Sequence, residues 1–336
     1  MVKETGSPKL LFENLDLTPI QPILWTSLHT EGPGRPVEYN PEWDLRALLL
    51  RQLEQIPYIK DLVKRLRRDP SLRQVCGYGD KAPCEAHFTQ MKHRIGSEGF
   101  RTIEAWLRRE ALRLRSSQPL SAVGLVQAAC IDGTDLPAWS SRDPHDTGRG
   151  LGDPDACVGR GKKGFSLGYL SLFLVDVEGF PLGHVEAPLN VNEKQLVEAL
   201  LHNVLGESIE VELLAGDSQL ESQALFMLVE SLKMSHVIAW RKLSGRVNPP
   251  DVLSVKDRID VEGPEWMRTL YKRLRAAAES FNGRAKSRLA YQRLTWQGLE
   301  NVGIHVGLVL MVAYAVCIAA YGIGRPELRQ SVVFFA

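Results

Sequence analysis

The chain has 336 residues, of which 44% are apolar and 24% charged, a composition typical of folded proteins rather than disordered ones. This length is sufficient for two domains of ordinary size, and a net charge of +1 excludes a uniformly polycationic protein. Basic residues are concentrated locally instead, because residues 268–293 contain eight Arg or Lys and one acid, Glu279. Local basic surfaces of this kind are typical of proteins that dock on nucleic acid at defined faces.

The first third of the chain is predicted to be an arm followed by a small helical region. Residues 1–40 are rich in Pro and Gly, which predicts extended chain or loop. Apolar residues at helical spacing, with basic residues on the other face, predict three helices: 43–68, 85–96 and 100–115. The last two have the order of a helix-turn-helix, in which one helix enters a DNA groove.

The pattern changes at Leu120, where a series of apolar, β-prone runs begins. Five strands are predicted: 123–131, 165–177, 180–189, 209–215 and 236–240. The dipeptide between the second and third runs is a hairpin signal and predicts antiparallel pairing. Amphipathic helices at 193–205 and 219–233 separate the later strands, which predicts parallel pairing there. This element order matches an α/β, RNase H-like mixed sheet of five strands with flanking helices, preceded by a small all-helical domain.

Residues 301–323 form an apolar segment that is long enough to cross a membrane. The segment contains His305 and several small residues, and it follows the basic helix without a break signal. We therefore expect a continuation of that helix, buried against the sheet, in a protein with no membrane partner. The alternative is a C-terminal membrane anchor.

Five cysteines at wide spacings, with no signal-peptide pattern before them, predict free thiols in a reducing cytosol. Cys76, Cys84, His87 and His93 have the residue types of a zinc site. Their spacing differs from that of the usual short zinc knuckles, so buried or surface thiols are the favoured interpretation.

Two aspartates follow strands that are neighbours in an RNase H-like sheet. Asp132 comes directly after the first run, and Asp217 follows the fourth run 85 residues later. Sites are commonly built at the strand ends of open sheets, and the helix that carries Glu279 can lie across this edge. Three converging carboxylates repel one another unless cations neutralise them. Two Mg²⁺ ions would do so, and would clamp the attacking and leaving oxygens of a phosphodiester.

Each of these acids also has a simpler explanation. Asp132 has the context of a turn aspartate, Asp217 that of a helix N-cap, and Glu279 that of a surface salt-bridge partner. The rival carboxylates are Asp135, three residues into the loop, and Glu221, one turn into a helix, and both are less well aimed. The combination of two strand-end aspartates and one acid in a basic helix favours the metal site.

Four stretches resemble the catalytic domain of insertion-sequence DDE transposases: IDGTDLPAW, RGKKGFSLGYLSLFLVD, LLAGDSQLES, and the long run that begins RAAAESFNGRAKSRLAYQRL. The likeness covers about residues 120–325. The last stretch is the most specific, because the family places an Arg four residues before its Glu and a Lys seven residues after it. Arg275, Glu279 and Lys286 meet this spacing.

The chain departs from the family pattern at two positions. The family's Tyr lies three residues before the Arg, where this chain has Lys272, and Tyr271 is displaced by one residue. The residue three after the second Asp is usually aromatic and here is Leu220. Neither position is a metal ligand, but both departures are compatible with a decayed transposase that keeps the fold without full activity.

The resemblance implies a transposase that nicks DNA at transposon ends and transfers the freed 3′-hydroxyl to target DNA. It implies that Asp132 bridges two Mg²⁺ ions, with Mn²⁺ as a substitute, and that Asp217 and Glu279 hold one each. Five basic residues are the candidates for contact with double-stranded DNA: Arg275, Lys286, Arg284, Lys162 and Lys163.

On this interpretation, residues 1–118 form the arm and helical DNA-binding domain, and residues 119–336 form the catalytic domain. Joining two DNA ends implies a homodimer in the DNA complex, in the cytoplasm at the nucleoid. Trp139 and Trp296 either pack in the core or stack on bases. The alternatives are a decayed or domesticated transposase that only binds DNA, and another RNase H-like metal-dependent nuclease.

Overall fold

The chain divides into two compact units. The computed structural model describes residues 6–28, 38–116, 128–161, 164–205, 209, 211–238 and 265–336. Unit 1 combines residues 1–120 with 285–336, and unit 2 comprises residues 121–284. The sequence had suggested a single domain over 119–336. The structure instead groups the C-terminal segment with the N-terminal helices, because the last long helix packs among them.

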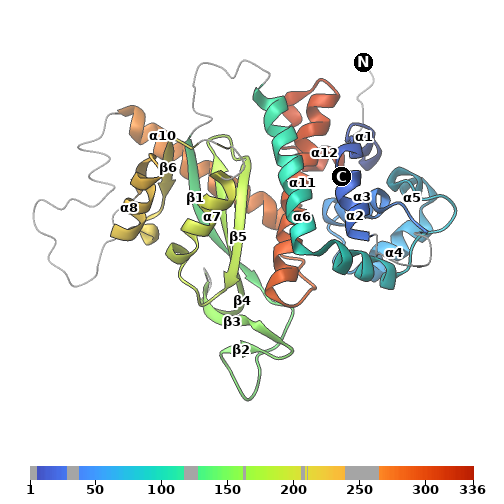
Figure 1. Cartoon of the computed structure of the whole chain (residues 1–336), viewed down its shortest axis with the longest axis horizontal. Coiled ribbons are helices and arrows are strands. Elements are labelled where there is room, and N and C mark those ends of the chain that lie inside the picture. Colours follow the sequence, from blue (N-terminus) through green and yellow to red (C-terminus); the bar gives the residue numbers. More distant parts are fainter. Residues whose placement is uncertain are drawn as a thin grey trace, which may run out of the picture. The chain divides into compact units, whose positions relative to one another are not determined.

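Unit 1 is helical throughout its described part (Figure 1). Its elements are α1 (Pro8–Glu13), η1 (Thr18–Ile20), α2 (Gln21–Leu28), α3 (Pro41–Leu53), α4 (Ile59–Arg68), α5 (Pro70–Cys76), α6 (Glu85–Ser116), α11 (Leu299–Gly322), η4 (Pro326–Leu328) and α12 (Val332–Phe335). The prediction of an extended arm or loop over residues 1–40 was wrong for residues 8–13 and 18–28, which are helical. Ser7 caps α1 and Pro8 occupies its first turn, and buried apolar side chains such as Phe12 and Leu24 anchor these helices.

Two breaks shape the central helices of unit 1. The predicted helix 43–68 is divided into α3 and α4, because Gln55 adopts a left-handed φ of 54° and Pro57 follows it. The predicted stop at Gly96 is confirmed as a kink inside α6, where φ is 65° and ψ is 173°. Glycine tolerates this left-handed backbone without the clash that a Cβ would cause.

Helix α11 is apolar on all sides and forms the centre of unit 1. It is the one described helix that is long and apolar enough to cross a membrane, with a mean hydropathy of 2.3, and 89% of that window is buried inside the protein. The prediction of a buried helix is therefore confirmed. The predicted partner was wrong, because α11 packs mainly against α6 and α3 rather than against strands. It also does not continue the basic helix, since Ala290 and Gly298 take positive φ values between the two.

The candidate zinc residues do not form a metal site. In the described part of the chain no three His, Cys, Asp or Glu side chains are grouped closely enough to hold a metal ion. Cys76 is buried and His87 instead contacts Asp44, with 2.7 Å between Nε2 and Oδ2. All five cysteines are free thiols, as predicted.

Unit 2 is built around a seven-stranded mixed sheet. Its strands are β1 (Ala128–Pro137), β2 (Arg149–Gly150), β3 (Asp153–Gly161), β4 (Gly164–Asp176), β5 (Pro181–Pro188), β6 (Leu213–Gly216) and β7 (Ser235–Ile238). The order is β2-β3-β4-β1-β6-β7, and β5 pairs with β4. The prediction of five strands was wrong in number, because β2 and β3 extend the sheet beyond the expected core. The five predicted strands are all present, although residues 123–127 of the first, 210 of the fourth and 239–240 of the fifth lie outside the described residues.

Pairing within the sheet is of two kinds. β4 is antiparallel to β1, β3 and β5, and residues 164–168 of β4 pair with β3 while residues 169–175 pair with β5. β1 and β6 are parallel, as are β6 and β7. The antiparallel and parallel halves therefore meet at β1, as the element order predicted.

Helices cover both faces of this sheet. α7 (Val197–Leu205) packs on β4 and β5, and η2 (Glu193–Gln195) precedes it, with its Glu193 side chain against Gly133. α10 (Glu265–Arg288) lies on the other face (Figure 1), where Phe281 meets the ring of Phe173 edge-on at 5.2 Å. α8 (Gln223–Ser231) connects β6 to β7, after η3 (Ser218–Leu220). α10 thus crosses β1 at Asp132 and meets the end of β6 at Gly216.

Candidate active site

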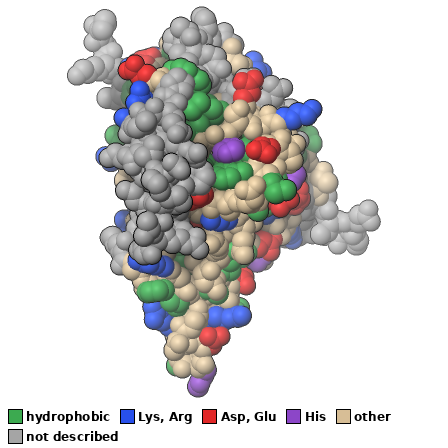
Figure 2. Space-filling view, turned by 90° about the vertical axis from the view of Figure 1, so that its left-hand side faces the viewer, with side chains coloured by type: hydrophobic (Ala, Val, Ile, Leu, Met, Phe, Trp, Pro, Cys, Tyr) green, Lys and Arg blue, Asp and Glu red, His purple; other side chains and the backbone are tan. Residues whose placement is uncertain are grey.

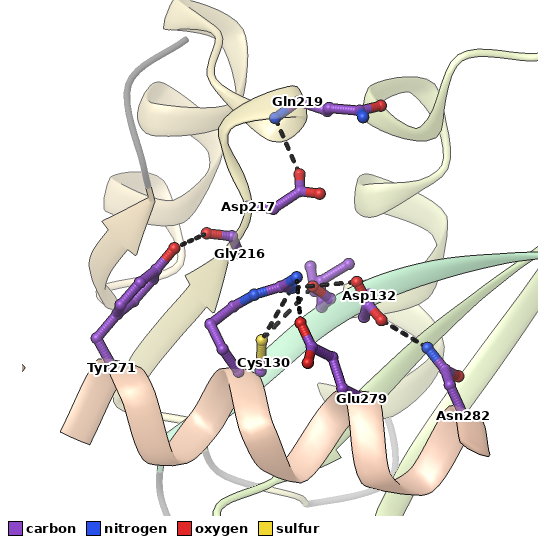
Figure 3. A network of polar contacts seen from close by, with 10 residues as sticks. Cys130, Asp132, Gly216, Asp217, Gln219, Tyr271, Glu279 and Asn282 are labelled. Atoms are coloured by element: carbon purple, nitrogen blue, oxygen red, sulfur yellow. Dashed lines mark hydrogen bonds and ion pairs between the residues drawn. The ribbon is translucent and has the colours of Figure 1, made fainter. Parts of the chain in front are cut away.

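The two predicted aspartates lie at the same level of neighbouring strands. The parallel pairing of β1 with β6 runs from Ala128 opposite Leu213 to Cys130 opposite Ala215. Continuing this register by two residues brings Asp132 level with Asp217. Figure 3 shows Asp217 at the end of β6, turned toward Gln219, and Asp132 on β1, turned toward Arg275 and Asn282 of α10. The neighbouring strands thus bring together residues that are 85 positions apart.

Asp132 is buried within β1 and points toward α10. Its side chain is 8% exposed, and its neighbour Gly133 faces the opposite side of the sheet, against Glu193. Because side chains alternate along a strand, the rival Asp135 shares the face of Gly133, where its carboxylate lies next to Gly161. Asp135 therefore does not join Asp132. The turn interpretation of Asp132 is wrong, since this residue is part of the strand.

Asp217 follows β6 and caps the short helix η3. Its Oδ1 accepts a 2.9 Å hydrogen bond from the backbone amide of Gln219. The capping interpretation is thus correct, and it is compatible with a place in the site because capping uses one of the two carboxylate oxygens. The rival Glu221 comes after η3, and its backbone carbonyl accepts a hydrogen bond from Lys194.

α10 presents four polar side chains on the face that meets the strand ends. Tyr271, Arg275, Glu279 and Asn282 are spaced by four, four and three residues, which places them in one stripe along the helix (Figure 3). The adjacent stripe is apolar and buried, and Phe281 anchors it to the sheet. Packing of the apolar stripe fixes the rotation of α10 and so aims the polar stripe at Asp132.

The guanidinium of Arg275 lies between the carboxylates of Asp132 and Glu279. Its Nη1 is 3.1 Å from Oδ1 of Asp132, and its Nη2 is 3.5 Å from Oε1 of Glu279 (Figure 3). Nη1 also lies 3.9 Å from the Sγ of Cys130. Glu279 itself is 64% exposed, so its contact with Arg275 is screened by water, whereas the contact with Asp132 is not.

Two further contacts at this site were not foreseen from the sequence. The side-chain amide of Asn282 donates a 2.6 Å hydrogen bond to Oδ2 of Asp132. The hydroxyl of Tyr271 donates a 3.3 Å hydrogen bond to the carbonyl of Gly216, directly before Asp217. The displacement of this Tyr from the family position therefore leaves it on the site. A helical-wheel comparison with Glu279 would have found both residues, since they share its face.

The electrostatics of the site reflect this crowding of charges. Burial lowers the pKa of Arg275, but the charge of Asp132 and the thiol of Cys130 outweigh it, and the pKa lies above its ordinary value. Burial also raises the pKa of Cys130 to about 12, an effect that Arg275 opposes and that Asp132 and Asp217 reinforce. Cys130 is thus a neutral thiol, and the positive charge of Arg275 is permanent.

The remaining predicted DNA contacts have different environments. Arg284 is held within unit 2, where its Nη2 donates a 2.5 Å hydrogen bond to the carbonyl of Gly179. Lys286 is half-buried, one turn beyond Asn282 on α10. Lys162 and Lys163 lie outside the described residues, between β3 and β4 in the sequence.

The two candidate stacking tryptophans also differ. Trp296 is held inside unit 1, with the charged groups of Arg51 and Lys92 over its ring at 5.0 and 4.5 Å from the centroid. Trp139 is 51% exposed and follows β1 into the β2–β3 extension. In Figure 2, the narrow lower end shows basic, acidic and apolar side chains side by side. The half-exposed ring of Trp139 is accessible for stacking, whereas two basic side chains lie over the ring of Trp296.

The residue types at the site suit a magnesium ion, because Mg²⁺ prefers oxygen ligands and three carboxylates are present. Their arrangement is not that of a ready metal site. In the described part of the chain no three acidic, His or Cys side chains are grouped closely enough to bind a metal ion. The space between Asp132 and Glu279 is taken by Arg275.

Comparison with known proteins gives one similarity, in unit 1. A family model described as "Transposase domain (DUF772)" matches residues 8–94, about a quarter of the chain. The matched range runs from α1 into α6. No curated protein and no solved structure matches the chain significantly. The similarity supports a transposase and concerns the helical unit rather than the sheet.

Proposed function

We propose that the chain is a DDE-type transposase that cleaves DNA at transposon ends and joins the freed 3′-hydroxyl to target DNA. The transposase-domain match at residues 8–94 supports the class of protein. The type of chemistry is supported by unit 2, which carries Asp132 on β1, Asp217 directly after β6, and Glu279 on the helix α10 that packs on the sheet.

The topology of unit 2 supports an RNase H-like core. Without the β2–β3 extension the strand order is β5-β4-β1-β6-β7. The first three strands are antiparallel and the last three parallel, with α7 and α8 in the connections. This is the arrangement that the RNase H-like interpretation of the sequence requires.

The observation that carries the proposal is the register of β1 and β6, which when extended brings Asp132 level with Asp217, together with the position of Glu279 on α10 beside Asp132. These three carboxylates would hold the Mg²⁺ ions. When bound, the ions would supply charge neutralisation and activation of the attacking oxygen in a phosphodiester displacement. The three acids come from separate segments: Asp132 lies within β1, Asp217 directly follows β6, and Glu279 lies on α10.

Other residues of the chain would position these acids and the DNA. Asn282 orients the carboxylate of Asp132, and Tyr271 ties α10 to the end of β6 next to Asp217. Lys286 would contact phosphates beside the scissile bond, together with Lys162 and Lys163. Unit 1 would bind double-stranded DNA at the transposon ends, and two copies would be required to hold both ends, in the cytoplasm at the nucleoid.

The test is a strand-transfer assay with the full chain. The DNA that flanks the coding region is first searched for terminal inverted repeats. A labelled pre-cut end with the repeat sequence is then incubated with Mg²⁺ and a supercoiled plasmid. We expect a joined product, lost in Asp132→Ala with DNA affinity retained. Cleavage without joining would indicate a different metal-dependent nuclease. Binding without cleavage or joining would indicate a DNA-binding protein derived from a transposase.

A further inference from the structure

One cation of the protein itself is placed between the proposed metal ligands. Arg275 contacts Oδ1 of Asp132 at 3.1 Å and Oε1 of Glu279 at 3.5 Å, and Asn282 holds the other oxygen of Asp132 (Figure 3). A metal ion shared by Asp132 and Glu279 would have to occupy the space that this guanidinium fills.

The burial of Asp132 explains why a cation is needed there. Its side chain is 8% exposed, and an ionised carboxylate removed from water is strongly destabilising unless a positive charge compensates it. Asn282 supplies a hydrogen bond but no charge. Arg275, itself 19% exposed, supplies the charge. Without Arg275 or a metal ion, the folded chain would carry an uncompensated buried anion.

We propose that Arg275 acts as the counter-ion of Asp132 in the DNA-free protein, and that metal binding requires its guanidinium to leave. This inference rests on the proposed function, since it takes Asp132 and Glu279 as metal ligands. The two cations exclude each other, because they repel and use the same oxygen of Asp132. Arg275 therefore lowers the metal affinity of the DNA-free protein.

DNA offers the displaced guanidinium a new partner. A phosphate accepts two parallel hydrogen bonds from Arg, in the same geometry as a carboxylate. Arg275 thus has two states. In the DNA-free protein it contacts Asp132, and in the DNA complex it contacts a phosphate. Since each ligand favours the state in which Arg275 has left Asp132, DNA and metal strengthen each other's binding.

The test measures binding of Mn²⁺ alone to the full-length, DNA-free protein by titration calorimetry. Arg275→Gln removes the charge but keeps a polar side chain of similar length. We expect Arg275→Gln to bind Mn²⁺ about tenfold more tightly than the wild type, since a charge-assisted hydrogen bond no longer opposes the ion. The matched control is Arg273→Gln, which removes an exposed Arg from the same helix and should leave the affinity unchanged.

A second variant keeps the inference testable if Arg275→Gln does not fold, which circular dichroism would reveal. Arg275→Lys retains the charge but lacks the fork that reaches two carboxylates, so Mn²⁺ affinity should rise by a smaller factor than in Arg275→Gln. Equal or weaker Mn²⁺ binding by both Arg275 variants, with binding still abolished by Asp217→Asn, would overturn the inference and leave the proposed site intact. Absence of Mn²⁺ binding in every variant would overturn the metal site as well.

Discussion

The side-chain amide of Asn282 donates a 2.6 Å hydrogen bond to Oδ2 of Asp132, across 150 positions of the sequence. The other oxygen of the same carboxylate is held by Arg275. α10 thus orients both oxygens of a buried acid that belongs to a central strand. Because a metal ligand must be held in a defined orientation, Asn282 is expected to matter for the reaction without contacting DNA.

Replacement of Asn282 by Ala should reduce strand transfer and Mn²⁺ affinity by about ten- to a hundredfold, the range typical of residues that orient a metal ligand. The unfolded fraction at assay temperature should stay small, and DNA affinity should not change. Ser280→Ala is the control, because Ser280 is exposed on the same helix. Loss of activity with unchanged Mn²⁺ affinity would contradict an orienting role.

Substitutions of Arg284 and Lys286, two residues apart on α10, should have different effects: the first on stability, the second on DNA binding. Arg284→Ala removes a buried donor to the carbonyl of Gly179, and should lower the free energy of unfolding by about 1–3 kcal/mol with the salt dependence of DNA binding retained. Lys286→Ala should leave stability nearly unchanged and reduce the slope of log affinity against log salt concentration by about one. Urea unfolding and binding titrations at several salt concentrations distinguish these outcomes. The reverse pattern would assign the phosphate contact to Arg284.

Unit 1 should lose stability in mild acid through His305. This residue is fully buried in α11, with Nε2 2.9 Å from the carbonyl of Tyr291 and Nδ1 3.4 Å from Nε2 of Gln52. Burial and the nearby charge of Arg51 lower its pKa to about 3, against about 6.5 in the unfolded chain. The stability due to neutral His305 is therefore complete above pH 6.5 and is lost progressively as the pH falls toward 3.

The free energy of unfolding should fall by about 1.4 kcal/mol for each pH unit below 6.5, because the unfolded chain binds one proton more than the folded chain. Urea unfolding between pH 7 and pH 5 measures it. His305→Gln should reduce this slope, whereas His202→Gln should not, because His202 is exposed on α7. An unchanged slope in His305→Gln would show that His305 is protonated at the same pH in both states.

The thiols should differ in reactivity. Cys84 is exposed, whereas burial raises the pKa of Cys130 to about 12. With a disulfide reagent at pH 8, the folded protein should show one rapidly reacting thiol, lost in Cys84→Ser, and Cys130 should react only on unfolding. Rapid labelling of Cys130 in the folded chain, located by peptide mass analysis, would mean that α10 opens readily from the sheet.

The sequence pattern located the strands of the core because each is a continuous apolar run. β3 escaped prediction, since its sequence DPDACVGRG has no alternation, and it is a strand only because its backbone pairs with β4. The prediction for the arm, residues 1–40, failed for a related reason. Its Pro and Gly residues suggested a loop, while the burial of Phe12 and Leu24 that stabilises α1 and α2 depends on helices distant in the sequence.

The acids of the site were predictable because two follow apolar runs directly and the third lies in a specific spacing of charges. The side chains that contact these acids were not predictable. Whether Arg275 meets a phosphate or Asp132 depends on how α10 is rotated, and that rotation is set by the packing of Phe281 on Phe173. Similarly, the apolar pattern of α11 predicted burial but carried no information about which elements would surround it.

Unit 1 is discontinuous, and this has a consequence for how the protein is made. α3 and α6 leave the ribosome early, whereas α11, which covers their apolar faces, begins only at Leu299. The helical unit therefore cannot complete its core until unit 2, encoded between its two parts, has already emerged. A chain cut before Leu299 would leave the buried faces of α3 and α6 without α11, so the region that carries the transposase-domain similarity is expected to need the C-terminal segment for its stability.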